Sequence, residues 1–220
     1  MAQQLANGAF GVTEVVNVHV YAGPNCQDLN NWKSMKPSEI YAAVTGTTEE
    51  AFIDHLTMFT TSMEGPTTEI KGGLYNNTLV KSGKTGRAEM TDALADMNAF
   101  VALGLLEKST DGSDVDSYSV TQNFGAVKCL TGDTCVMQRG TGKMVPVHII
   151  VYQFLPDSIP SFAFEAGNAG TIDMSGDMLC TDVKIGTGTV GTFWSIIDNG
   201  DEINVDDACS ASPIYPPVNG

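Results

Sequence analysis

Basic side chains are scarce in this sequence of 220 residues. It has 11 Lys and Arg against 26 Asp and Glu, which gives a formal net charge of −15. So few cations cannot neutralise the phosphates of a bound duplex, which excludes an ordinary basic DNA-binding protein. Charged residues make up only 17 % of the chain, below the usual quarter, and apolar residues make up 42 %. The chain is therefore acidic because it lacks cations, and it has enough apolar residues for a folded core.

Long apolar runs are missing as well. The longest, residues 145–155, is interrupted by Pro146, His148 and Gln153 and is shorter than the roughly 18 residues of a membrane-spanning helix. Residues 1–12 have neither a basic segment nor an apolar run, so we expect no signal peptide and no membrane association. We expect the protein to be made in the cytoplasm.

Metal-ligand and redox patterns are also absent. The cysteines form no CxxC pair, and none of the three histidines stands near a cysteine at ligand spacing. An odd number of cysteines without a signal peptide predicts free, mostly buried thiols in a reducing compartment. The cysteines are Cys26, Cys129, Cys135, Cys180 and Cys209, and the histidines are His19, His55 and His148. We expect the histidines to be structural and no metal to be bound.

One segment matches a cofactor-binding pattern. Gly186–Gly191 (GTGTVG) has the spacing of a dinucleotide-binding loop, and Asp206 follows at the distance of a ribose-binding acid. That loop must open a helix, whereas residues 192–197 are short, β-branched and followed by Asn199-Gly200. A turn between strands is the favoured interpretation. No GxSxG elbow or other nucleophile motif is present, so we expect neither enzymatic activity nor a cofactor.

The first third of the chain mixes strand and helix signals. Alternating apolar and polar residues predict a strand over residues 13–22, and a Pro- and Asn-rich loop is expected at residues 23–36. A short helix is expected to begin at Pro37 and end at Gly46. Residues 47–59 start with a second helix signal, TTEE, but their β-branched residues leave helix and strand both open.

A hairpin followed by a helix is predicted next. Residues 67–85 form two extended stretches around the turn-favouring pairs Gly72-Gly73 and Asn76-Asn77. Residues 88–103 place apolar side chains at helical spacing, with an acidic stripe opposite and Gly104 as the stop. The apolar positions are Met90, Ala93, Leu94, Met97, Phe100 and Val101, and the stripe is Glu89, Asp92 and Asp96.

Short strands separated by glycine-containing turns account for the rest. They are expected at residues 117–121, 126–138, 144–154, 162–166, 171–178 and 189–197. This spacing is typical of antiparallel sheets. We predict a mainly β (β+α) fold: an antiparallel β-sandwich or barrel with one long lateral helix and one or two short helices, in a single domain of residues 1–220.

Four segments together resemble the major tail tube proteins of tailed bacteriophages. They are residues 72–105, 132–156, 161–179 and 192–198, so that the resemblance covers about half of the chain, within 72–105 and 130–198. One motif is a hairpin with Arg139, Thr141, Gly142, Lys143 and Pro146. The other is a hairpin with Glu165, Ala166, Gly167, Thr171 and Asp173. Residues 23–66 look longer than the minimal unit of that family and are interpreted as a possible inserted elaboration.

The resemblance implies a structural role in the virion tail, without substrate or cofactor. It implies subunits in six-fold rings, stacked into a tube through which DNA passes without specific binding. Its partners would be further copies of the chain and other tail proteins, such as the tape measure, sheath or terminator proteins. An acidic channel would repel DNA, because screening at 8–10 Å still lets carboxylates act across a duplex-wide lumen.

Two sets of residues follow as candidates. The acidic residues expected to face the lumen are Glu69, Glu165, Asp173 and Asp177. The hairpin positions expected at contacts between subunits are Thr67, Thr68, Ile70, Thr171, Ile172 and Met174. The main alternative is a capsid-decorating or adaptor β-sandwich protein. A dinucleotide enzyme using Gly186–Gly191 and a surface adhesin are minor ones.

Overall fold

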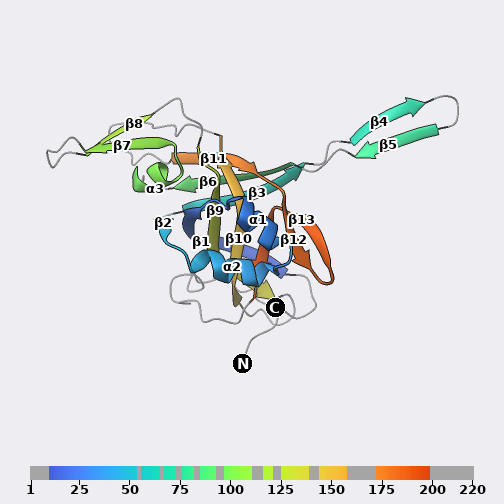
Figure 1. Ribbon diagram of the computed structural model, residues 1–220, viewed down its shortest axis with the longest axis horizontal. Coiled ribbons are helices and arrows are strands. Elements are labelled where there is room, and N and C mark those ends of the chain that lie inside the picture. Colours follow the sequence, from blue (N-terminus) through green and yellow to red (C-terminus); the bar gives the residue numbers. More distant parts are fainter. Residues whose placement is uncertain are drawn as a thin grey trace, which may run out of the picture.

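The architecture is that of a computed structural model (Figure 1). It describes residues 10–53, 56–64, 67–72, 76–81, 85–92, 97–110, 116–120, 125–138, 144–157 and 172–198. The helices are α1 (Cys26–Trp32), α2 (Pro37–Thr45) and α3 (Met97–Ala102). The strands are β1 (Phe10–Ala22), β2 (Glu49–Ile53), β3 (Leu56–Glu64), β4 (Thr67–Gly72), β5 (Asn76–Lys81), β6 (Thr85–Asp92), β7 (Leu106–Thr110), β8 (Asp116–Val120), β9 (Lys128–Gln138), β10 (Met144–Pro156), β11 (Ile172–Met178), β12 (Thr181–Ile185), β13 (Gly188–Thr192) and β14 (Trp194–Ile197).

One large antiparallel sheet dominates the fold. Its strand order is β2-β1-β9-β10-β11-β6-β3, and β14 also pairs with β10. The sheet is rolled, so that β1 contacts β3 from the other end of the strand order. The hairpins β4–β5, β7–β8 and β12–β13 form separate two-stranded sheets. The predicted mainly β, antiparallel fold is confirmed, and we call the rolled sheet the barrel.

Both faces of the central strands are buried. The inner core contains Val18, Leu130 and Val151 together with α3, and the outer core lies between the barrel and the helices α1 and α2. Along β10, Ile149 and Val151 belong to the inner core, whereas Ile150 and Tyr152 belong to the outer one. A strand that is buried on both faces needs apolar residues at consecutive positions, which explains the apolar residues 149–152 (IIVY) in β10.

The predicted long helix over residues 88–103 is wrong. Residues 85–92 form strand β6, and a helix is described only at α3. In β6 the buried residues Ala88 and Met90 alternate with Arg87 and Glu89, so the acidic residue assigned to a helical stripe lies on a strand face. Over so few residues, the spacing of the apolar side chains in β6 fits both a helical and a strand period. The segment forms a strand because it pairs with β3 on one edge and with β11 on the other. The predicted stop is confirmed, since Gly104 follows α3 with a φ of +74°.

The predictions for the first third of the chain are confirmed only in part. The strand over 13–22 and the helix at Pro37 are confirmed as β1 and α2. The segment predicted as a loop contains α1, which begins with a capping box between Asn25 and Asp28. The second helix signal is wrong, because residues 49–53 form β2 and pair with β1.

Residues 23–66 are built into the barrel. They supply α1 and α2 over the outer core and the strands β2 and β3, and Ile40 and Ile53 are fully buried. Their interpretation as an insertion relative to the minimal unit of the tail tube family stays a prediction.

The described cysteines differ in their exposure to solvent. In the described part of the chain, Cys129 is buried, whereas Cys26 and Cys180 are exposed free thiols, so the expectation of mostly buried thiols is wrong for these two. Burial raises the pKa of the Cys129 thiol, which keeps it protonated and unreactive.

Tyr152 makes the stability of the outer core sensitive to alkaline pH. Its ring is fully buried, its hydroxyl donates to Ser195 Oγ at 2.8 Å, and burial raises the pKa of Tyr152 to about 12. The unfolded tyrosine ionises near pH 10, so the stabilisation is complete below that pH and is lost as pH rises through about 12. We expect the free energy of unfolding to fall by about 1.4 kcal/mol per pH unit in this window from Tyr152 alone.

Urea unfolding of the wild type and Tyr152→Phe at a series of pH values tests this prediction. At neutral pH the variant should be about 1 kcal/mol less stable, because the hydrogen bond to Ser195 is gone. Its stability should fall less steeply than that of the wild type above pH 10. Parallel curves for the two proteins would contradict the assignment of this titration to Tyr152.

Candidate functional site

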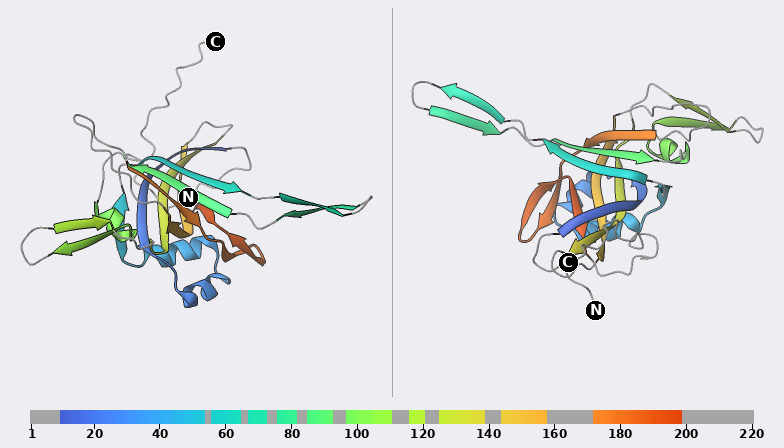
Figure 2. Two further views of the ribbon diagram at one scale, coloured as in Figure 1. Left: turned by 90° about the horizontal axis from the view of Figure 1, so that it is seen from above. Right: turned by 180° about the vertical axis from the view of Figure 1, so that it is seen from behind.

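Two hairpins extend from the barrel on opposite sides (Figures 1 and 2). β4 and β5 pair with each other from Thr67–Lys81 to Gly72–Asn76 and, within the described residues, with no other strand. Each of these strands therefore has one edge without a backbone partner in the part of the chain that the structure describes. Such an edge is a template for a strand from another chain. The predicted hairpin at residues 67–85 is confirmed as β4–β5.

The second hairpin, β7–β8, is fastened by its own side chains. Lys108 Nζ lies 2.7 Å from Asp116 Oδ2 and 5.7 Å from the centre of the Tyr118 ring. The hydrogen bond from Lys108 lowers the pKa of Asp116. The sequence predicted β8, but it gave no signal for β7, whose residues after Leu106 are polar and exposed.

The outward face of strands β3, β6 and β11 is polar and open. Paired residues form two rows across the three strands, one with Ser62, Arg87 and Asp177 and the next with Thr60, Glu89 and Ser175. The residues that alternate with them in β6, Ala88 and Met90, point into the inner core. Among the described residues, those of the outer core beneath α1 and α2 include none from these three strands, so these two helices do not pack on this face.

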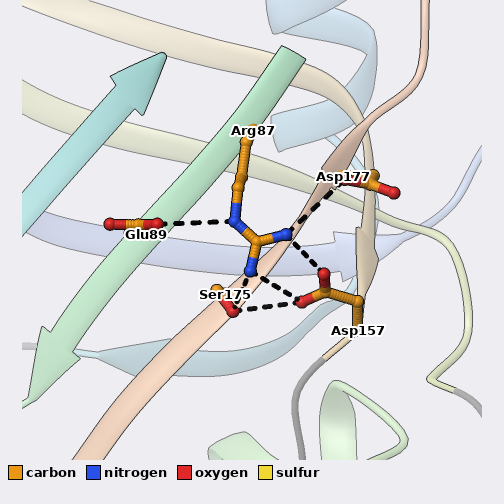
Figure 3. Close-up of polar contacts among 5 residues, drawn as sticks. All are labelled: Arg87, Glu89, Asp157, Ser175 and Asp177. Atoms are coloured by element: carbon orange, nitrogen blue, oxygen red, sulfur yellow. Dashed lines mark hydrogen bonds and ion pairs between the residues drawn. The ribbon is translucent and has the colours of Figure 1, made fainter. Parts of the chain in front are cut away.

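Arg87 joins the strands of this open face (Figure 3). Its guanidinium contacts Asp157 Oδ2 at 2.5 Å, Ser175 Oγ at 2.7 Å and Glu89 Oε1 at 3.4 Å, and Asp177 Oδ1 lies 3.8 Å away. The hydrogen bond to Asp157 is the main cause that raises the pKa of Arg87 above its ordinary value. Three carboxylates surround one cation, so the face keeps a surplus of negative charge.

Arg87 also fastens the end of β10 to the open face. Asp157 directly follows β10, and Ser175 Oγ donates a hydrogen bond to it at 3.0 Å, so the two side chains and Arg87 link β10, β11 and β6. Neither Arg87 nor Asp157 was among the residues predicted from the sequence. The two residues lie 70 positions apart, so the only signal in the sequence is an arginine in a chain with few cations.

Substituting Arg87 should destabilise the protein modestly and in a salt-dependent way. Arg87→Ala leaves Asp157, Glu89 and Asp177 without their shared cation, and we expect a loss of about 1 kcal/mol at low salt. The loss is this small because the side chain is 41 % exposed. In about 1 M salt, where the screening length is near 3 Å, the difference should shrink.

Urea unfolding at both salt concentrations measures this effect. Arg87→Lys is the matched control, since it keeps the charge without the two-pronged contact to Asp157, and its stability should fall between the other two. A loss for Arg87→Ala that does not depend on salt would contradict the electrostatic explanation.

The predicted acidic residues are only partly described. Asp177 lies on the open face with its side chain 61 % exposed. Glu69 and Asp173 lie in β4 and β11, but the surroundings of their side chains, like the whole of Glu165, are outside the described residues. The structure thus brings Asp177 together with Glu89 and Asp157, which were not among the candidates. Their exposure to a channel stays a prediction.

The predicted contact positions fall into three groups. Thr67, Thr68 and Ile70 lie in β4 on the projecting hairpin, and Ile172 begins β11. Thr171 lies outside the described residues. Met174 is 2 % exposed and its side chain packs in the inner core, and its place at a contact between subunits stays a prediction. The alternation along β11 turns Ser175 outward instead.

Each of the two described histidines lies beside a carboxylate, and their structural role stays a prediction. His148 Nδ1 lies 2.6 Å from Asp133 Oδ1 and its ring stacks on Tyr41, whereas His19 Nδ1 lies 2.9 Å from Glu49 Oε2. His55 lies outside the described residues. Among those that are described, no group of three His, Cys, Asp or Glu side chains converges as a metal site would, and no helix is long and apolar enough to cross a membrane.

The glycine-rich segment forms a turn, as favoured. Gly186 and Thr187 connect β12 to β13, and Gly186 has a φ of +64°. The residues after the glycines continue in strands β13 and β14. A dinucleotide loop needs a helix N-terminus at this point, so the geometry contradicts that alternative.

Comparisons with known proteins yield similarity in structure only. No family model and no curated protein matches the sequence. Seven chains of solved structures match the fold. One belongs to the cryo-EM structure of the anti-feeding prophage (AFP) baseplate, 6-fold symmetrised; it is 8 % identical, the match covers 90 % of this chain and 97 % of that chain, and the TM-score is 0.31. At this identity and score the similarity carries no argument about function.

Proposed function

We propose that this chain is a structural protein of a phage virion, the subunit of a tail tube. Six copies would form a ring, and stacked rings would enclose a channel that conducts DNA. The role is mechanical, without catalysis or cofactor. The protein would be made in the host cytoplasm and reside in the tail, beside proteins such as the tape measure, sheath or terminators.

The observation that supports this proposal most is the hairpin β4–β5. It extends from the barrel, and within the described residues its outer edges have no backbone partner. Long exposed edges cause uncontrolled association unless a defined partner covers them. A neighbouring copy that covers them makes a head-to-tail contact, which closes into a ring when the rotation between copies allows it.

The charge distribution fits a DNA conduit. The open face of β3, β6 and β11 has three carboxylates around Arg87, and the whole chain has a formal net charge of −15. A wall with this surplus repels phosphate, so DNA would slide past it instead of adsorbing. We propose that this face, with Asp177 on it, lines the channel.

Negative-stain electron microscopy of the purified protein tests the proposal. Rings or tubes with six-fold symmetry are expected as the concentration is raised. Protein that stays monomeric at high concentration and instead binds expanded capsids would overturn the tube and support the capsid-decorating alternative. Calorimetric titration with NAD, repeated on Gly188→Val, should detect no binding to either protein.

A further inference from the structure

A groove of about 540 Å³ runs along β14. Its walls are the start of α2 at residues 36–38, the end of β12 at residues 184–186, and residues 194–198 of β14 and its end. Successive side chains of a strand point to opposite faces, yet all five of the residues 194–198 line the groove. What they share is one backbone edge, so the groove follows the edge of β14.

That edge has its hydrogen-bonding groups turned toward the groove. Within the described residues β14 pairs only with β10. The Tyr152 N–H donates to the Phe193 carbonyl at 3.3 Å, so the backbone groups of Phe193 point to β10. Because these groups alternate along a strand, those of Trp194 and Ile196 point to the groove. A strand that enters the groove would meet donors and acceptors in register.

The sequence directly after β14 has the pattern of such a strand. Asn199-Gly200 is a strong signal for a two-residue hairpin turn, and residues 201–205 (DEINV) alternate polar and apolar side chains. In a hairpin with this turn the hydrogen-bonded pairs are 198–201, 196–203 and 194–205. These pairs use the backbone N–H and C=O groups of Trp194 and Ile196, which are the groups that β14 turns toward the groove.

The alternation of apolar and polar residues in 201–205 also matches the two faces of β14. Trp194 and Ile196 pack on the inner core. A hairpin with this turn would place Ile203 opposite Ile196 and Val205 opposite Trp194. The neighbouring Ile197 belongs to the outer core beneath α2, and Glu202 would lie opposite it. Apolar side chains would thus extend the apolar face, and the polar ones would point toward α2 and β12.

Charge favours the same occupant. Lys36 and Lys184 line the groove, and within the described residues neither ammonium group has a carboxylate within ion-pair distance. Two cations beside one groove stand out in a chain with 11 Lys and Arg in total. In the proposed strand, Glu202 would lie on the side that faces these two lysines.

We propose that residues 201–205 of the same chain occupy the groove as an added antiparallel strand on the edge of β14. The strand would cover an edge that otherwise invites pairing with other copies. The proposal does not depend on the tail tube function, since it concerns a single chain.

A pair of engineered cysteines tests the register. In a background with Cys26, Cys180 and Cys209 changed to Ser, Ser195→Cys combined with Asn204→Cys creates a non-hydrogen-bonded pair. Such pairs have Cα atoms about 4.5 Å apart, within the range for a disulfide. In the control, Ser195→Cys combined with Ile203→Cys, the side chains lie on opposite faces. Mild oxidation of dilute protein should link the first pair within one chain at least about tenfold faster than the control.

Two outcomes of the disulfide experiment would overturn the proposal. Disulfides only between chains would show that the occupant is a second copy, and equal or absent linkage in both variants would exclude the register; each overturns the proposal. Amide hydrogen exchange of the unmodified protein, resolved by residue, provides a check without cysteines. Ile203 and Val205 should exchange slowly and Glu202 and Asn204 fast, whereas uniformly fast exchange over residues 201–205 would overturn the added strand.

Discussion

Replacing residues 65–84 by Asn-Gly is expected to abolish the formation of rings and tubes while the barrel stays folded. Glu64 and Thr85 are register partners at the ends of β3 and β6, so a two-residue turn can join them without changing the pairing of these strands. Within the described residues β4 and β5 pair only with each other, so the deletion breaks no strand pairing of the barrel. It is designed to remove the proposed contact to a neighbouring copy.

The expected effect is large because strand edges carry several hydrogen bonds. Each is worth about 1 kcal/mol net, and each 1.4 kcal/mol changes an equilibrium constant tenfold. We expect the protein concentration at which assembly begins to rise at least about 100-fold. Light scattering and electron microscopy measure it, and circular dichroism and thermal unfolding report on the barrel.

A second variant separates the strand edges from the tip of the hairpin. Gly72 and Asn76 are also register partners, so replacing residues 73–75 by Asn-Gly shortens the tip and keeps both strands. This variant should still assemble. Normal tubes from the full deletion would show that β4–β5 is not the contact, and the proposed function would lose its main support.

Gly176→Ala is expected to be strongly destabilising. A methyl group at this position would lie 2.4 Å from the Leu155 carbonyl oxygen and 2.6 Å from Phe154 Cε2. The neighbouring backbone cannot give way, since Pro156 pairs with Gly176 itself and Phe154 is fully buried. We expect a loss of about 3 kcal/mol and a melting temperature lower by roughly 6–12 °C.

Gly188→Ala is the matched control for this substitution. Gly188 also lies in a strand, but an added methyl group there has no atom within 4 Å. Its effect on the free energy of unfolding should stay within about 0.5 kcal/mol. Urea and thermal unfolding measure the stability of both variants relative to the wild type. Equal stabilities would show that β11 and β10 do not approach each other as closely as the structure has them.

The contrast between strand β6 and its predicted helix shows where sequence patterns are ambiguous. Ala88 and Met90 fit a helical period together with later residues, and they fit a strand period with Arg87 and Glu89 between them. Local sequence offers no decision, because β3 and β11, the strands that pair with β6, come from about 30 residues before and 85 residues after it.

The Arg87 group marks a second limit of the sequence. Its partners come from β6, β11 and the end of β10, and nothing near Arg87 in the sequence announces Asp157 or Ser175. In contrast, the strand that contains Asp177 was predicted, because its residues form a local extended pattern. Residues in one strand are predictable from their neighbours, whereas contacts between strands depend on the order in which the sheet is assembled.

The sequence by itself determined the class of fold and the surplus of acid. Turn residues and alternating periods are local, so the antiparallel strands, the hairpin at residues 67–85 and the turn at Gly186 could be predicted from short windows. Only the tertiary structure decided that β6 is a strand, that Met174 faces the core and that β4–β5 stands apart from the barrel. These properties follow from pairing between distant strands, and the free energy of that pairing overrides weak local preferences.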